Sequence, residues 1–190
     1  MHRLLVRPYV ALVSWYFRRL KLPLSRLADL FRPKERFLLP SFASLEEFAG
    51  WLAAHTRWRP DPLAGAFDIF PSLKHLAWQL AHHGQAADDC DGLAYLAAQG
   101  ALQFADAPDL VYLVTVVLDP TRLPLQQAAH VLCIFRHAGR WRVVSNSELY
   151  PQSYASFWRA LTDNPHCQGH AILFYELRDA HLRPAREPAA

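Results

Sequence analysis

The sequence predicts an α+β fold, in which helices precede an antiparallel sheet along the chain. Two observations support this prediction. Helix caps and apolar residues at helical spacing dominate up to residue 104, and β-branched and aromatic runs separated by short turns follow Pro108. The 190 residues, 52% hydrophobic and 19% charged, suit one domain with a sizeable core. This composition excludes the disordered, collagen-like, coiled-coil and multi-spanning membrane classes.

The chain begins with a basic amphipathic segment, residues 1–36, for which we expect two helices. Its nine Arg and Lys residues against two acidic residues give a charge of +7, whereas residues 37–190 carry eleven basic and fifteen acidic groups and a charge of −4. The apolar run 4–17 is shorter than the roughly 20 residues that span a bilayer, and no signal-peptide cleavage site follows it. Ser25 is expected to cap the second helix, which ends before Pro33. The apolar face of that helix would consist of Leu27, Leu30 and Phe31.

Three interpretations of residues 1–36 remain open. The helices could pack on the domain or a partner subunit, form a docking surface for an anionic membrane or a protein partner, or bind nucleic acid. We expect no nucleic-acid partner, because the basic charge is confined to this segment and the tryptophans are spread too evenly for a stacking platform. Three cysteines do not make a secreted disulfide framework. We therefore expect a cytoplasmic protein, with peripheral attachment to a membrane as the alternative.

The domain over residues 37–190 is expected to start with helices. Ser44 and Glu47 form a capping box, in which the serine hydroxyl reaches the backbone amide of the glutamate and the carboxylate reaches back. The predicted helices cover residues 45–55, 73–82 and 89–104, with a turn-rich stretch over 57–71.

The strands are expected after Pro108. A continuous β-branched and aromatic run predicts a buried strand, and two further runs are joined by a hairpin turn in which Gly139 supplies the positive φ that such turns need. A helix lies before the last strand. The predicted strands cover residues 110–118, 129–136, 141–145 and 171–177, and this helix covers 154–161.

The stretch from Asp88 to Asp91 contains the most informative residue for chemistry, Cys90. Asp88 and Asp89 can cap the helix, which places Cys90 in its first turn. Free backbone N–H groups and the positive helix end favour a thiolate there, whereas the neighbouring aspartates oppose it. The helix positions facing the same way as Cys90 are mostly alanines, so the helix can approach a sheet closely. Cys90 is therefore a candidate nucleophile.

A nucleophilic cysteine needs a base, and the base needs a residue that orients it. His130 lies in the second predicted strand and Asn146 follows the third, at the same far end of the hairpin. Cross-strand neighbours there lie about 5 Å apart, so the two side chains are expected to meet. Taken singly, these residues are more often a core cysteine, a hydrogen-bonded histidine and a turn-forming asparagine.

The order of these motifs resembles the transglutaminase-like cysteine-protease superfamily. The similarity rests on Asp-Cys-Asp at a helix start, His-Val in a strand, a short hairpin with a tryptophan, and an asparagine five residues beyond that tryptophan. Bacterial and phage members are similar in carrying Gly-Asp-Cys-(Asp/Glu)-Asp followed by alanine. The resemblance covers residues 73–151. The chain differs in having Asp88 where the family has glycine and Gly92 where it often has a second acid.

The resemblance implies a papain-like α+β domain with a catalytic triad. Cys90 would be the nucleophile, His130 the general base and acid, and Asn146 the orienting residue, where transglutaminases usually carry aspartate. The implied reaction is acyl transfer on a protein or peptide amide through a thioester, without a cofactor. Water as the acceptor gives peptidase or deamidase chemistry, which we favour, and an amine gives transglutaminase chemistry. The alternative is a catalytically silent domain that acts as an interaction module and is docked by residues 1–36.

An oxyanion hole would complete such a site. The backbone amide of Cys90 is one candidate donor, and the second is expected among Gln85, Gln79 and Trp78.

The other histidines and cysteines give weaker evidence for a functional site. The stretch from His166 to His170 offers zinc-ligand types, but a glycine interrupts it and no second half-site is found, so we expect no metal. Cys133 is expected in the core of its strand. Cys167 is the main rival to Cys90 as the reactive thiol.

Overall fold

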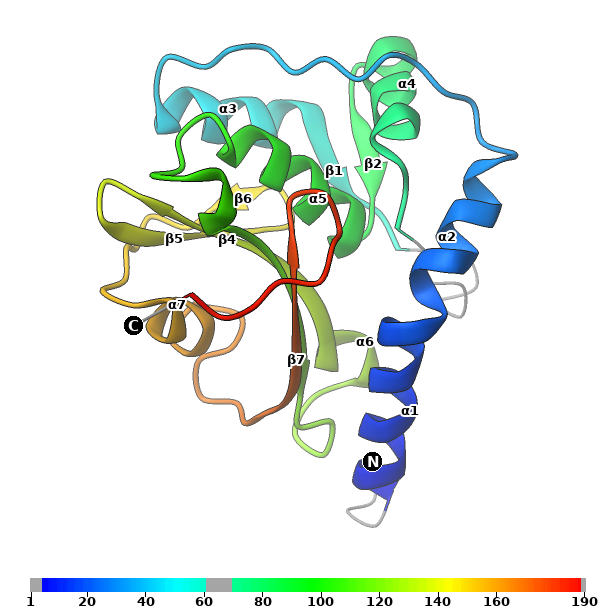
Figure 1. The fold of residues 1–190 in the computed structure, drawn as a ribbon, viewed down its shortest axis with the longest axis vertical. Coiled ribbons are helices and arrows are strands. Elements are labelled where there is room, and N and C mark those ends of the chain that lie inside the picture. The colour runs from blue at the N-terminus through cyan, green and yellow to red at the C-terminus, as the bar shows by residue number, and fades with distance from the viewer. Residues whose placement is uncertain (1–4, 61–69, 189–190) are drawn as a thin grey trace.

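The computed structural model describes residues 5–60 and 70–188, which form an α+β arrangement around a five-stranded sheet (Figure 1). The strand order is β6-β5-β4-β3-β7, and every neighbouring pair is antiparallel. The predicted α+β class and antiparallel sheet are confirmed. The strands are β3 (Val111–Leu118), β4 (Ala129–His137), β5 (Arg140–Ser145), β6 (Glu148–Leu149) and β7 (Ile172–Asp179).

Helices cover both faces of the sheet (Figure 1). On one face, α3 (Leu45–His55) and α5 (Cys90–Ala101) enclose a core with Val131, Cys133 and Phe135 of β4. On the other face, α7 (Phe157–Thr162) covers a second core that includes Leu132 and Ile134 of the same strand. Successive side chains of a strand point to opposite faces. Odd-numbered residues of β4 therefore face α5, and even-numbered ones face α7.

The hairpin between β4 and β5 has the predicted two-residue turn. Ala138 and Gly139 have φ angles of 49° and 73°, the combination that a type I′ turn requires. The register that follows places Ser145 opposite Leu132. Short helical segments connect the strands: the 3₁₀ segment η3 (Pro108–Leu110) precedes β3, and α6 (Leu125–Ala128) precedes β4.

The helices before the sheet follow their capping residues. The hydroxyl of Ser44 accepts from the N–H of Glu47 at 3.2 Å, and the Glu47 carboxylate accepts from the N–H of Ala43, one residue before the cap. The helix α4 (Leu73–His83) begins after Ser72 in the same way. Two short strands, β1 (Thr56–Trp58) and β2 (Ala86–Asp88), form a separate parallel pair that the sequence did not predict.

The predicted helix over 154–161 starts later than expected. Tyr154 pairs with Trp141 through two backbone hydrogen bonds of 2.9 Å, and α7 begins only at Phe157, where Ser156 caps it. Pairing with the sheet therefore takes precedence over the local helical pattern.

The N-terminal helices α1 (Val6–Arg19) and α2 (Lys21–Asp29) follow one another along one side of the molecule (Figure 1). The sequence predicted that Ser25 caps α2, but this residue lies inside the helix. Its hydroxyl donates to the carbonyl of Lys21 at 2.6 Å and accepts from the N–H of Phe70 at 2.9 Å. The helix starts earlier because Pro23 falls in the first turn, where a missing N–H costs no hydrogen bond. None of the helices among the described residues is long and apolar enough to cross a bilayer.

Candidate active site

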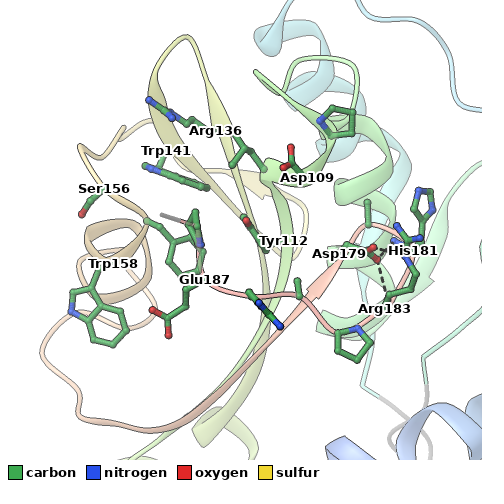
Figure 2. A pocket seen from close by; sticks show the side chains of 18 of the residues that line it. Asp109, Tyr112, Arg136, Trp141, Ser156, Trp158, Asp179, His181, Arg183 and Glu187 are labelled. Atoms are coloured by element: carbon green, nitrogen blue, oxygen red, sulfur yellow. Dashed lines mark hydrogen bonds and ion pairs between the residues drawn. The ribbon is translucent and has the colours of Figure 1, made fainter. Parts of the chain in front are cut away.

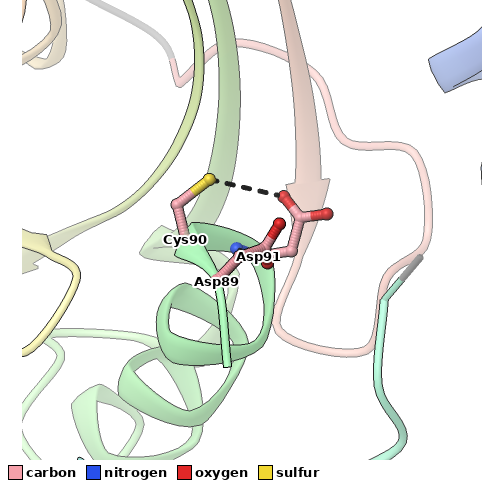
Figure 3. A group of neighbouring side chains, drawn as sticks. All are labelled: Asp89, Cys90 and Asp91. Atoms are coloured by element: carbon pink, nitrogen blue, oxygen red, sulfur yellow. Dashed lines mark hydrogen bonds between the residues drawn. The ribbon is translucent and has the colours of Figure 1, made fainter. Parts of the chain in front are cut away.

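Cys90 is the first residue of α5, as the sequence predicted (Figure 3). Asp89 is the N-cap, and its carboxylate accepts from the N–H of Asp91 at 2.9 Å. Asp88 ends β2 and accepts from the N–H of Asp89, also at 2.9 Å. The aspartates thus fix the start of the helix and hold the thiol at its N-terminal end.

The surroundings of Cys90 keep its thiol protonated. Burial of the sulfur is the largest cause, and the charges of Asp91 and Asp89 add to it, so that the pKa of Cys90 is raised well above its usual value. The ammonium of Lys21 and a backbone hydrogen bond from Val131 act in the opposite direction but are the smaller influences. The thiol lies 3.9 Å from the Asp91 carboxylate, to which it can donate. The favourable helix end is therefore outweighed in this structure.

A buried ion pair lies next to the thiol. Lys21 of α2 pairs with Asp91, and their side chains are only 1% and 2% exposed. The Lys21 ammonium also lies 4.6 Å from the ring centroids of both Phe17 and Phe70. The basic N-terminal segment thus contributes a charge to the immediate surroundings of Cys90. No local sequence pattern links positions 21 and 91, so the sequence did not predict this contact.

His130 is buried in β4, and its partner differs from the predicted one. Its Nε2 lies 2.9 Å from the hydroxyl of Ser145, and its ring stacks on that of His166 with centroids 4.0 Å apart. Burial and then the neighbouring His166 lower the pKa of His130 to about 3. The imidazole is therefore neutral near neutral pH, and in this buried position it is a weaker base than a solvated histidine.

The predicted contact between His130 and Asn146 is wrong in this structure because of strand alternation. Ser145 lies opposite Leu132, two residues from His130, and so shares its face of the sheet. Asn146 comes one residue later, in the turn after β5, with a φ of 52°. Its Oδ1 is buried without a hydrogen-bond partner in the described part of the chain. Counting the pairs out from the turn sets Asn146 against Val131, whose side chain faces α5, and so would have excluded Asn146 as the partner of His130.

The side chains of Cys90 and His130 lie on opposite faces of the sheet. Val131, whose backbone hydrogen-bonds the Cys90 sulfur, faces α5, whereas His130 projects to the α7 face, where His166 lies. Within residues 5–60 and 70–188, no hydrogen bond connects the sulfur to the His130 ring. The expected convergence of Cys90, His130 and Asn146 is thus absent from the structure. The nucleophile nevertheless lies against the strand at the residue next to the base.

The predicted second oxyanion donors are engaged elsewhere. Gln85 donates to the carbonyl of Ala54 at 3.0 Å, and Gln79 accepts from the N–H of Ala87 at 2.6 Å. Trp78 stacks on neighbouring histidine rings of α4. All three line a pocket of about 530 Å³ that Cys90 does not reach, together with Arg32, Arg57, Arg59, Pro60, His75, His83, Ala87 and Asp88. Of the predicted donors, the backbone N–H of Cys90 alone lies at the thiol.

The other two cysteines are shielded. Cys133 lies in the core facing α5, as predicted, and burial raises its pKa. Burial also raises the pKa of Cys167 to about 11.

Metal-ligand types gather at Cys90. Among the described residues, Asp89, Cys90 and Asp91 form the one group whose ligand atoms lie within 4.8 Å of each other. Asp91 is already paired with Lys21, so a cation there would compete with a buried ammonium. The stretch from His166 to His170 forms no such group within the described residues.

A second pocket lies away from all three predicted triad residues (Figure 2). It has a volume of about 1020 Å³ and lies beside α7 and the C-terminal end of β7. Tyr112, Trp141 and Trp158 give it aromatic walls, and Asp179 and Arg183 pair at 2.6 Å on the opposite side. Its residues come from distant parts of the chain, which is why no sequence motif predicted it.

No family model, curated protein or solved structure matches this chain. The function is therefore inferred from the residues and their geometry.

Proposed function

We propose that this protein is a papain-like cysteine enzyme that transfers the acyl group of a protein or peptide amide. Cys90 is the nucleophile, and His130 is the general base and acid. The observation that carries the proposal is the contact of the Cys90 sulfur with the backbone of Val131, because it puts a thiol at a helix N-terminus one residue away from a buried, neutral imidazole.

In this proposal, the arrangement described above is a resting form of the enzyme. In the active form, the first residues of β4 separate from β3, which lets His130 leave Ser145 and reach the face of the sheet that carries the sulfur. Asn146 then takes its predicted orienting role, because its buried Oδ1 has no hydrogen-bond partner among the described residues and can accept the N–H of the ring. A buried acceptor without a partner costs about 1–3 kcal/mol, which favours this exchange.

The chemical steps balance without a cofactor. His130 takes the thiol proton, and the thiolate attacks the amide carbonyl to give a tetrahedral intermediate. The imidazolium then gives its proton to the leaving amine as the carbon–nitrogen bond breaks, which leaves a thioester on Cys90. Water, with its proton taken by His130, attacks the thioester, and the acid and the free thiol are released. A primary amine in place of water would give a new amide.

A second function is favoured by one specific observation. The raised pKa of Cys90 and the separation of the two side chains on opposite faces of the sheet suit a catalytically silent domain that acts as an interaction module. In that case Cys90 is a structural thiol and His130 is held permanently by Ser145 and His166.

Thiol labelling at pH 6 decides between the two functions. Native protein is incubated with iodoacetamide, and the alkylated cysteines are identified by mass spectrometry after digestion. The enzyme is expected to label Cys90 faster than Cys133 and Cys167, and the His130→Ala variant is expected to lose this advantage. Equal labelling of Cys90 and Cys167, or an unchanged rate in His130→Ala, would overturn the catalytic proposal and support the interaction module.

A further inference from the structure

The exposed apolar side chains are concentrated in the N-terminal helices and the residues that follow them. Eight of the eleven large hydrophobic residues that the described chain exposes lie between residues 5 and 38. Phe31 is 84% exposed, Leu30 68% and Leu12 64%. Single exposed apolar residues are ordinary, but a concentration of them marks an interaction site. All of the eight except Leu38 lie on α1 and α2 or within two residues of their ends. We call these seven the outer apolar face: Leu5, Leu12, Trp15, Leu24, Leu27, Leu30 and Phe31.

The opposite side of these helices packs against the rest of the protein. Phe17, Lys21 and Ser25 are buried, and the carbonyl of Phe17 accepts from the guanidinium of Arg178 at 3.4 Å. The N–H of Phe70 donates to the Ser25 hydroxyl. Since the inner side is occupied, rotation of the helices cannot bury the outer apolar face against the sheet.

The helices that carry the outer apolar face are positively charged. The α1 helix has no acidic residue, and the single one in α2, Asp29, pairs with Lys34 at 3.1 Å and with Ser72. The side chains of Arg7, Arg19 and Arg26 are exposed on the same two helices. Apolar side chains with a basic rim and an exposed tryptophan are the features of helices that lie in the headgroup region of anionic membranes.

We propose that the outer apolar face docks the protein on an anionic lipid membrane, with α1 and α2 lying in the plane of the surface. The apolar side chains enter the boundary between headgroups and acyl chains, and the arginines contact the lipid phosphates. The helices have 14 and 9 residues, so they lie on the bilayer and do not cross it. This inference is independent of the chemistry at Cys90.

Vesicle co-sedimentation of the full chain tests the proposal. Vesicles of phosphatidylcholine alone are compared with vesicles in which a third of the lipid is phosphatidylglycerol. The protein is expected to bind the anionic vesicles, and raised salt is expected to weaken the binding. Trp15→Ser should lower the partition coefficient about tenfold, since it removes a large buried apolar contact with the lipid. Arg19→Gln should lower it about fivefold, as one charge at the surface contributes.

The chain offers matched controls. Trp158 is 50% exposed against 52% for Trp15, and Arg122 is exposed as Arg19 is. Both lie outside α1 and α2, so Trp158→Ser and Arg122→Gln should leave the partition coefficient unchanged. Equal binding to both kinds of vesicle, no binding to either, or equal losses in the control variants would overturn the proposal. Dimers in sedimentation velocity that Trp15→Ser converts to monomers, without vesicle binding, would show that a second copy covers this face instead.

Discussion

At the scale of single residues, His130 makes the stability of the fold depend on pH. Its pKa is about 3 in the folded protein because it is buried and stacked on His166, whereas a solvated histidine has a pKa near 6.5. The unfolded chain therefore binds a proton between these two pH values and the folded protein does not. Stability conferred by this histidine is complete above about pH 6.5 and is lost as the pH falls towards 3.

We expect the free energy of unfolding to fall by about 2 kcal/mol between pH 8 and pH 5 through His130 alone. Urea denaturation at the two pH values measures the loss. His130→Asn should remove most of this pH dependence, whereas the exposed His82→Gln should retain it. An identical pH dependence in His130→Asn and the native protein would contradict the assignment.

Substitutions of Ser145 and Asn146 are expected to change the rate of Cys90 alkylation in opposite directions. Ser145→Ala removes the hydrogen bond that stabilises the ring in its resting position, so the rate of Cys90 alkylation at pH 6 should rise about fivefold, as for a hydrogen bond of about 1 kcal/mol. Asn146→Ala removes the proposed acceptor of the active form, so the rate should fall by a similar factor. Circular dichroism of both variants checks that the fold is retained. Rates that change in the same direction would contradict the proposed exchange.

The site residues show which part of a site the sequence predicts. Cys90 was placed correctly because a helix start depends on the aspartates beside it. His130 was placed in the correct strand, but its partner was assigned one residue too far, and a shift of one residue in a strand exchanges the faces of the sheet. The contact of Lys21 with Asp91 depends on two segments that are distant in the sequence, and only the folded chain brings them together.

At the scale of elements, the close contact between α3 and α5 depends on a glycine. A Cβ added at Gly100 would lie 2.2 Å from the ring of Phe48, which is fully buried. The small residues of α5 thus allow the two helices to share one core on the sheet. Gly50 of α3, by contrast, has nothing within 4 Å of an added Cβ.

Gly100→Ala should therefore destabilise the protein by about 1–3 kcal/mol, because the Phe48 ring has to move within a packed core. Gly50→Ala is the matched control in a helix with open space, and it should stabilise the protein by about 0.5–1 kcal/mol. Thermal or urea unfolding of the two variants measures both effects. A neutral Gly100→Ala would show that the contact is loose.

The elements that sequence patterns predicted are those with local signals. The cap at Ser44, the β-branched run of β3 and the turn at Gly139 each stand where the chain forms the expected element. The parallel pair β1–β2 was missed, because its three-residue strands are defined by pairing with each other across about thirty residues of chain. Short strands have too few residues to show an alternation.

At the scale of the whole molecule, the N-terminal helices are part of the folded unit. The ammonium of Lys21 offsets the charge of Asp91 in a nearly waterless environment. Removing one partner of a buried ion pair typically costs about 3–5 kcal/mol, since the other charge stays buried. Residues 37–190 alone would keep Asp91 and lose Lys21, together with the apolar cover from Phe17.

Lys21→Met is expected to lower the free energy of unfolding by about 3–5 kcal/mol. Adding Asp91→Asn to this variant should restore much of the loss, because the double variant buries no uncompensated charge. A chain that starts at residue 37 should accumulate as aggregates. Urea midpoints of the single and double variants, with size-exclusion chromatography of the short chain, measure these effects. A double variant no more stable than Lys21→Met would contradict the pairing.

The position of Lys21 has one more consequence, which concerns communication across the molecule. The outer side of α2 is the proposed lipid contact, and its inner side carries the ammonium that lowers the pKa of Cys90. A membrane that displaces α2 would move the Lys21 ammonium and so change the pKa of the Cys90 thiol. Thermodynamic linkage makes such an effect mutual: ionising the thiol would change the affinity for lipid by the same factor. The lipid affinity of the intact protein is then a reporter of the charge state of Cys90.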